Sequence, residues 1–230
     1  MAPLLPRIEI DTADDPRAAV IWLHGLGADG SDFAPLVGEL DLSTCPPIRF
    51  VFPDAPAIPV TLNGGYVMPA WYDIRGSALV REEDAAGIDR SARAIQALVD
   101  HEVRRGIPPH AIVLAGFSQG CAMALHTGLR HPQRLAGIIA LSGYLPLADT
   151  LGAQRSEANL ATPIFMAHGK QDPVVALDRA VASHQQLTRQ GYQVQWHAYD
   201  MEHSVHPREV ADIASFLRSV LGRAGGASIA

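Results

Sequence analysis

Short apolar runs recur along the chain and are rich in β-branched residues. They lie at 18–25, 48–53, 111–118, 135–143, 162–169 and 194–200. Runs of this length without polar alternation are typical of strands that are buried on both faces, as they are in a parallel sheet. The pattern therefore predicts a set of strands.

Longer amphipathic stretches separate these runs. The clearest spans 85–105, where apolar residues repeat at three- and four-residue steps, at Ile88, Ala92, Ile95, Val99 and Val103. This spacing gives a helix with one buried stripe. Further helices are predicted at 119–131, 174–190 and 207–222, the last with Pro207 at its first position. Alternating strands and helices predict an α/β fold, with a mostly parallel sheet and right-handed crossovers.

Two regions interrupt the alternation, at 54–84 and 144–161, and both are expected to be surface loops that border a site. No internal repeat or low-complexity linker divides the chain. We expect a single domain over 1–230, whose last residues, 221–230, form a frayed tail.

Composition narrows the function classes. The chain has 230 residues, of which 48% are hydrophobic, enough for one core without disulfides or metals. The net charge of −6 and the absence of basic clusters argue against a nucleic-acid partner. Cys45 and Cys121 have no metal-ligand spacing. No signal peptide or long apolar span is apparent, so a cytoplasmic location without membrane insertion is expected.

The segment with the strongest chemical signal is Gly116-Phe117-Ser118-Gln119-Gly120, which follows an apolar strand and precedes a helix. In this context the pattern is that of a nucleophile elbow, which projects a serine oxygen above the sheet. The flanking glycines let strand and helix approach without clashing Cβ atoms. A glycine-bounded turn with an ordinary serine is the alternative.

A serine hydroxyl needs a base, and the base needs an orienting group. Asp172 lies in the loop after the strand at 162–169, where the orienting acid belongs, although it could instead cap the following helix. His203 lies in the last strand-to-helix loop and is the predicted base. The competitor is His206, which adjoins Pro207 at the expected helix start.

The oxyanion of an acyl-transfer intermediate needs backbone donors. One comes from the residue after the nucleophile, here Gln119. The second is expected from the loop His24-Gly25-Leu26-Gly27, which follows an early strand and precedes a predicted helix, and we assign it to the N–H of Leu26. Neither the Rossmann spacing nor a P-loop lysine is present.

Four motifs occur in a characteristic order: HGLGADG at 24–30, GFSQG at 116–120, HGKQDPVV at 168–175, and the late pair His203-Ser204. With them the chain closely resembles the phospholipase/carboxylesterase family of α/β-hydrolases, which includes small bacterial carboxylesterases and acyl-protein thioesterases. The resemblance implies the α/β-hydrolase fold, the triad Ser118, Asp172 and His203, the oxyanion donors Leu26 and Gln119, and no cofactor. It also implies esters with short to medium acyl chains as substrates, and a homodimer by resemblance alone.

Three positions depart from the family pattern: Cys121, Glu202 and Ala176. A thiolate at Cys121 would be favoured by the helix dipole, yet its side chain should not point with Ser118 toward one substrate atom. Glu202 would raise the pKa of His203 if its carboxylate turned inward, and would have no effect if exposed.

The leading hypothesis is a serine carboxylesterase that forms an acyl-enzyme, with Trp71 and Met68 expected to line the acyl pocket. Surface packing is an equal alternative for both side chains. An acyl-protein thioesterase or lysophospholipase would use the same chemistry on other substrates. A catalytically silent binding module is the third hypothesis, and its signature would be a missing triad member.

Overall fold

The computed structural model describes residues 4–76 and 81–222, and a seven-stranded sheet forms its centre. The strand order is β1 (Arg7–Asp11), β3 (Ile48–Pro53), β2 (Ala18–Leu23), β8 (Ile112–Phe117), β9 (Gly137–Leu141), β10 (Ile164–Gly169) and β11 (Val194–Tyr199). All neighbours are parallel except β1, which pairs antiparallel with β3. The predicted α/β-hydrolase fold is confirmed.

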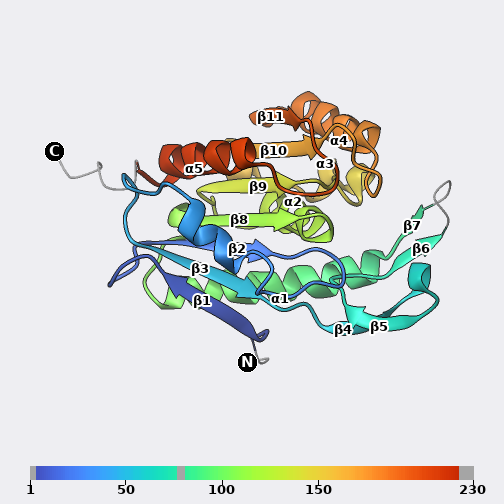
Figure 1. The fold of residues 1–230 in the computed structure, drawn as a ribbon, viewed down its shortest axis with the longest axis horizontal. Coiled ribbons are helices and arrows are strands. Elements are labelled where there is room, and N and C mark those ends of the chain that lie inside the picture. The colour runs from blue at the N-terminus through green and yellow to red at the C-terminus, as the bar shows by residue number, and fades with distance from the viewer. Residues whose placement is uncertain (1–3, 77–80, 223–230) are drawn as a thin grey trace.

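Helices cover both faces of this sheet. The crossovers through α1 (Ala85–Arg104), α2 (Gln119–Arg130) and α4 (Leu177–Arg189) all move across the sheet in one direction, so right-handed connections place these helices on one face. The return from β2 to β3 puts the 3₁₀ helix η1 (Ala34–Glu39) on the other face. That face also carries α5 (Pro207–Leu221), which lies in front of the strands in Figure 1 while α1 passes behind them.

Two neighbouring residues of β9 show the two layers directly. A Cβ on Gly137 would lie 3.0 Å from the ring of Phe216 on α5, whereas the Ile138 side chain reaches Gly128 on α2. Successive residues of a strand point to opposite faces, so the sheet separates α5 from α2. A larger side chain at Gly128 or Gly137 would push the adjacent helix away.

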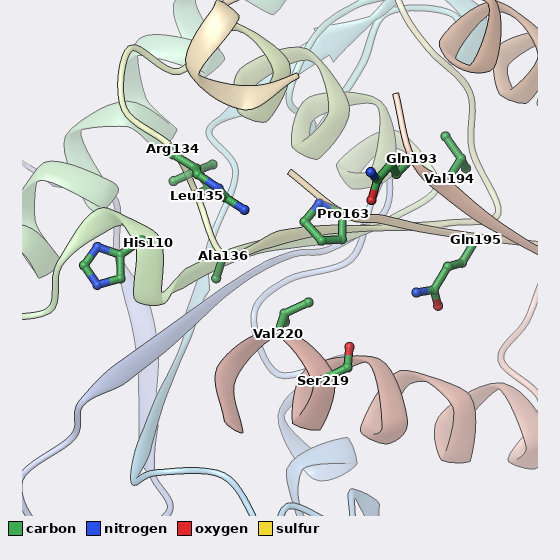
Figure 2. Close-up of a pocket in the computed structure, with 10 residues that line it drawn as sticks. All are labelled: His110, Arg134, Leu135, Ala136, Pro163, Gln193, Val194, Gln195, Ser219 and Val220. Carbon is green, nitrogen blue, oxygen red and sulfur yellow. The ribbon is translucent and has the colours of Figure 1, made fainter. Parts of the chain in front are cut away.

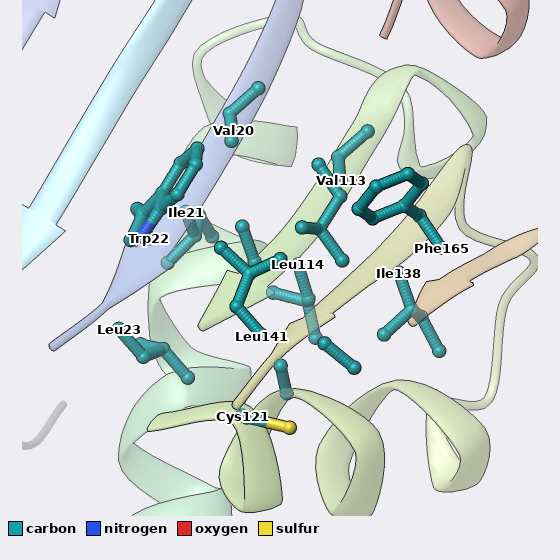
Figure 3. Packing of buried hydrophobic residues seen from close by; sticks show 14 of the residues in the cluster. Val20, Ile21, Trp22, Leu23, Val113, Leu114, Cys121, Ile138, Leu141 and Phe165 are labelled. Atoms are coloured by element: carbon teal, nitrogen blue, oxygen red, sulfur yellow. The ribbon is translucent and has the colours of Figure 1, made fainter. Parts of the chain in front are cut away.

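The core follows from this layering. Strands β2 and β10 are buried along their whole length, and β9 likewise. Figure 3 shows Ile21, Leu114 and Ile138 from three neighbouring strands packing side by side. At about 25 cal/mol per Å² of buried apolar surface, this continuous cluster is the main source of stability.

Several elements differ from the sequence-based expectation. The edge strand β1 was not predicted, because its residues alternate and are partly exposed. The 54–84 region, expected to be a loop, contains two hairpins, β4 (Ala57–Val60) with β5 (Tyr66–Pro69) and β6 (Ile74–Gly76) with β7 (Arg81–Glu83). The helix expected after 24–27 is only the 3₁₀ segment η1.

Shorter helices complete the fold. They are η2 (Thr61–Asn63), η3 (Pro109–Ala111), η4 (Ala148–Thr150), α3 (Leu151–Gln154) and η5 (Glu157–Asn159). Of the predicted tail, Leu221 is buried at the end of α5, and the part from residue 223 onward lies outside the described residues. No helix in the described part of the chain is long and apolar enough to cross a membrane.

Replacing Ile21 with alanine tests the importance of the central strands. Ile21 is fully buried in β2, so the cavity should lower the free energy of unfolding by about 2–5 kcal/mol. Urea unfolding measures this loss, provided that the m-value is the same for the wild type and the variant. The control is Ile8→Ala on the edge strand β1, where the side chain is 39% exposed and the loss should be less than about 1 kcal/mol. Equal losses at the two positions would contradict the assignment of the core.

Candidate active site

Ser118 occupies a strained turn between β8 and α2. Its backbone has φ 56° and ψ −116°, a conformation that is costly for a residue with a side chain. The flanking glycines make the turn sterically feasible. A Cβ on Gly116 would lie 2.2 Å from the carbonyl oxygen of Gly120, and a Cβ on Gly120 would lie 2.1 Å from that of Leu23. The elbow predicted from GFSQG is therefore present, with its hydroxyl held at the carboxyl edge of the sheet.

The three residues of the predicted triad come together in one chain of hydrogen bonds. Ser118 Oγ lies 2.9 Å from His203 Nε2, and His203 Nδ1 lies 2.7 Å from Asp172 Oδ2. With Nδ1–H donating to the carboxylate, Nε2 is left as the acceptor for the serine proton. This arrangement can turn the hydroxyl into a nucleophile.

Asp172 is fixed from both sides. Its Oδ1 accepts hydrogen bonds from the N–H groups of Val174 and Val175, each 2.8 Å long. Its Oδ2 also lies 3.4 Å from Nε2 of the buried His168. These contacts orient one carboxylate oxygen toward His203. Asp172 does not cap α4, which begins at Leu177, so the helix-cap alternative is wrong.

The contact of His168 with Asp172 is a finding of the structure. Its Nε2–H donates to the carbonyl oxygen of Val175, 2.8 Å away, and burial lowers the pKa of the ring. His168 is therefore a neutral donor behind the carboxylate. The HGKQDPVV spacing carried that signal, because it places the histidine four residues before the aspartate.

The loop that carries His203 rests directly on β10. A Cβ on Gly169 would lie 2.3 Å from the carbonyl oxygen of Glu202, so the loop can approach only because this residue is glycine. The imidazole of His203 packs on Phe117, with ring centroids 4.7 Å apart. The competitor, His206, instead caps α5: its Nδ1 accepts from the N–H of Arg208, and its own N–H donates to Glu209.

The proposed oxyanion donors lie beside the nucleophile. A Cβ on Gly25 would lie 3.4 Å from Cβ of Ser118, so the loop 24–27 runs alongside the elbow. Within the described residues, no acceptor pairs with the N–H of Leu26 or of Gln119, the latter at the first position of α2. Two free amides beside a nucleophile suit a developing negative charge.

His24 and the β5 strand hold this loop in place. His24 Nε2 accepts from the N–H of Ala55, 3.0 Å away, and Nδ1–H donates to the carbonyl oxygen of Gly25, 2.7 Å away. Burial lowers the pKa of His24, which keeps the ring neutral as this pairing requires. The N–H of Gly27 donates to the carbonyl oxygen of Pro69.

The Gln119 side chain has a second function that the sequence did not reveal. Its amide accepts from the N–H of Trp71 (2.8 Å) and donates to the carbonyl oxygen of Tyr72 (2.7 Å). Trp71 itself is 1% exposed, and its indole N–H donates to the carbonyl oxygen of His24. The structure thus places Trp71 beneath the oxyanion loop, whereas Met68 is half-buried beside Gly27.

The departures from the family pattern leave the triad intact. Cys121 is completely buried against Gly143, and burial raises the pKa of its thiol, so it is not an alternative nucleophile. The side chains of Glu202 and Ala176 are both exposed. This is the arrangement expected if the Glu202 carboxylate does not turn toward His203.

A groove of about 430 Å³ adjoins His203, between η1 and α5. Its walls include Phe33, Leu36, Phe117, Val205 and Val210. Neither Met68 nor Trp71 lines it. A larger cavity of about 750 Å³ lies at the opposite, amino-terminal end of the strands, near His110, Ala136 and Pro163 (Figure 2). Ligands of open α/β sheets bind at the carboxyl ends of strands, and the larger cavity contains no serine paired with a base.

One group of side chains has the residue types of a metal site. Glu9, His101 and Glu102 bring donor atoms within 4.8 Å of one another. Both carboxylates are paired with arginines, however, Glu9 with Arg105 at 2.9 Å and Glu102 with Arg105 at 3.0 Å. The group is therefore an ion-pair network.

Comparison with known proteins agrees with this geometry. The profile of the family described as Phospholipase/Carboxylesterase matches residues 7–221. The chain is 38% identical over 220 residues to acyl-protein thioesterase 1 of Yarrowia lipolytica, covering 94% of this chain and 97% of that protein. It is 42% identical over 209 residues to acyl-protein thioesterase 1 of Neurospora crassa, covering 87% and 85% respectively.

Solved structures show the same fold. Arabidopsis thaliana SOBER1 superposes with a TM-score of 0.83 at 30% identity, covering 89% of this chain and 99% of SOBER1. Zea mays acyl-protein thioesterase 2 gives a TM-score of 0.83 at 28% identity, covering 94% and 99%. The similarity therefore extends over nearly the whole of each protein.

Replacing Gln119 with methionine tests the side-chain bridge to residues 71–72. The backbone N–H at position 119 is kept, whereas two buried backbone groups lose their partners. We expect the free energy of unfolding to fall by about 2–6 kcal/mol, at about 1–3 kcal/mol for each of the two unsatisfied groups. Chemical denaturation measures it, and a change below about 0.5 kcal/mol would show that the bridge is dispensable.

Glu209 gives the fold a dependence on pH. It is buried in the first turn of α5, and burial raises its pKa from near 4.5 to about 7. Between these values the folded chain keeps a proton that the unfolded chain has lost. The stabilisation is therefore complete below about pH 4.5 and is lost as the pH rises through 7, by about 3 kcal/mol in total. Glu209→Gln should remove this slope. If the free energies of unfolding of the wild type and the variant change in parallel between about pH 4.5 and 8, Glu209 is not the source of the pH dependence.

Proposed function

The chain belongs to the phospholipase/carboxylesterase family of α/β-hydrolases and is a serine hydrolase, and we propose that it hydrolyses acyl thioesters, and the corresponding oxygen esters, through an acyl-enzyme on Ser118. One observation carries the proposal. The hydrogen bond from Ser118 to His203 gives the serine proton an acceptor, and the hydrogen bond from His203 to Asp172 orients the imidazole and stabilises its protonated form.

The steps follow from these two hydrogen bonds. Ser118 Oγ bonds to the carbonyl carbon while its proton moves to His203 Nε2. The carbonyl oxygen becomes an oxyanion, which the amides of Leu26 and Gln119 stabilise. The bond to the leaving sulfur or oxygen then breaks, and His203 returns the proton to that atom. A water molecule attacks the acyl-enzyme by the same sequence, releasing the acid and restoring Ser118.

The names of its relatives support thioesters as the main substrates. Two proteins that match nearly the whole chain, at 38% and 42% identity, are named acyl-protein thioesterase 1. Carboxylesterase activity, the first hypothesis from the sequence, has support from the family as a whole. The same residues suit both reactions, because only the leaving atom differs. On the strength of those names, acyl groups on protein thiols are the proposed main substrate class.

The acyl chain should lie on the side of Ser118 away from His203. Met68 on β5 borders the oxyanion loop, with its sulfur 3.7 Å from the Cβ position of Gly27. We propose that Met68 forms part of the wall of the acyl pocket. Trp71, beneath the oxyanion loop, then supports that loop and does not line the pocket. No cofactor takes part in the proposed reaction.

A silent binding module is less well supported, because the triad is complete and hydrogen-bonded. A serine-directed phosphonate would distinguish a serine hydrolase from a binding module, since only an activated serine reacts rapidly. A cytoplasmic location and a homodimer stay predictions from the sequence.

The proposed function is tested with butyryl, octanoyl and palmitoyl substrates, each as a thioester and as an oxygen ester. Ser118→Ala should lower kcat on every substrate by on the order of a millionfold, as for comparable triads. The matched control is Ser219→Ala, which removes a hydroxyl from the cavity of Figure 2 and should leave kcat within about twofold. Turnover that survives in Ser118→Ala would refute the nucleophile. Faster hydrolysis of oxygen esters at every chain length would favour the carboxylesterase hypothesis.

A further inference from the structure

Two chain segments form the groove beside His203: the segment that follows the oxyanion loop and the segment that follows His203. One wall is formed by residues just after the oxyanion loop, from Phe33 to Leu36, and the other by residues just after His203, including Val205 and Val210. Phe117, the residue before the nucleophile, forms the floor, and its ring also packs on the imidazole. The groove therefore opens directly at the base.

The geometry of the tetrahedral intermediate decides which part of a substrate this groove can receive. Four groups surround the reacting carbon: Ser118 Oγ, the oxyanion, the acyl chain and the leaving atom. The leaving atom must take its proton from His203 Nε2, so it lies within hydrogen-bond reach of that nitrogen. The acyl chain must then point away from His203. Whatever is attached to the leaving atom extends on the His203 side, where the groove lies.

We propose that the groove between η1 and α5 binds the leaving group of the substrate, an alcohol or thiol with an apolar body and no negative charge. This inference rests on the proposed function and adds a specificity site to it. Leu36, half-buried on η1, and Val210 on α5 are the residues that set the width of the site.

The lining gives the chemical class. Phe33, Leu36, Phe117, Val205 and Val210 supply an apolar surface, which favours burial of carbon-rich groups. Asp32 and Glu39 lie at the exposed rim, and none of the described residues that line the groove is a lysine or an arginine. A carboxylate on the leaving group would meet two like charges, whereas a cation would be attracted. Neutral and cationic leaving groups are therefore expected to bind best.

Kinetics can separate this site from the acyl site. Substrates that share an acyl group form the same acyl-enzyme, so their deacylation rates are identical whatever the leaving group. A change in the leaving-group site should alter kcat/KM, which reports the steps through acylation, and leave deacylation unchanged. A change in the acyl site should alter both.

The test uses Leu36→Trp, which fills the groove from its partly exposed side. Butyryl thioesters of methanethiol and of cyclohexylmethanethiol form the leaving-group series, and S-methyl thioesters of butyrate and octanoate form the acyl series. The variant should lower kcat/KM for the cyclohexylmethyl thioester by about tenfold or more, about 1.4 kcal/mol in transition-state binding. It should change the S-methyl substrates less than about twofold, with deacylation unaltered. Ile8→Trp, on the exposed edge strand, is the matched control.

A second measurement tests the charge of the rim. Butyrylthiocholine and S-(3,3-dimethylbutyl) thiobutyrate have the same shape, but only the first is cationic. The ratio of their kcat/KM values should fall about two- to fivefold in the double variant Asp32→Asn, Glu39→Gln, as expected for exposed charges. S-butyryl 3-mercaptopropionate, whose leaving group is anionic, should gain in the same variant. An unchanged ratio would remove the charge preference from the proposal.

The outcomes distinguish the two proposals. If Leu36→Trp affects the octanoyl substrate more than the cyclohexylmethyl thioester, or alters deacylation, the groove binds the acyl chain and the inference is overturned. If the wild-type protein hydrolyses none of these substrates in a Ser118-dependent way, the proposed function itself fails. Equal losses on all substrates in Leu36→Trp, with normal unfolding, would also overturn the inference, because they would indicate a displaced His203.

Discussion

The catalytic geometry depends on one close approach of two backbones. The first turn of α2 lies so near the end of β2 that a Cβ on Gly120 would overlap the carbonyl oxygen of Leu23. This contact fixes the oxyanion loop, which continues from β2, against the elbow, which continues from β8. The strained backbone of Ser118 is maintained because the parallel strands on both sides hold it. The buried core of the sheet therefore supplies the rigidity that the site needs.

The sequence was most informative where the structure is local. Strands β2, β8 and β9 each show themselves as an uninterrupted apolar run, and Ser118 is marked by glycines two positions away on either side. Asp172 and His203 could be located by their positions after strand ends, because the carboxyl ends of parallel strands meet at one edge of the sheet.

What the sequence did not reveal depends on contacts between distant segments. The edge strand β1 lacks an apolar run, because polar residues alternate with its two isoleucines and its side chains stay partly exposed. The bridge from Gln119 to residues 71–72 spans more than 45 positions and follows no local pattern. The η1–α5 groove likewise exists only when residues near position 36 meet residues near 210. Trp71, expected in the acyl pocket, had to be placed by its hydrogen bond to His24.

The link between the β4–β5 hairpin and the oxyanion loop has a consequence for how substrate range can change in this family. Pro69, at the end of the hairpin, accepts a hydrogen bond from Gly27, and the next residues are joined to Gln119 and His24. The hairpin tip, by contrast, carries the exposed side chains of Leu62, Tyr66 and Val67. The turn of the hairpin is tied to the protein through Thr61, whose N–H and hydroxyl donate to Asp73, whereas the base is tied to the proposed oxyanion donors. A change in the exposed side chains of the tip should therefore leave the proposed oxyanion donors in place, whereas a change at the base should alter their alignment.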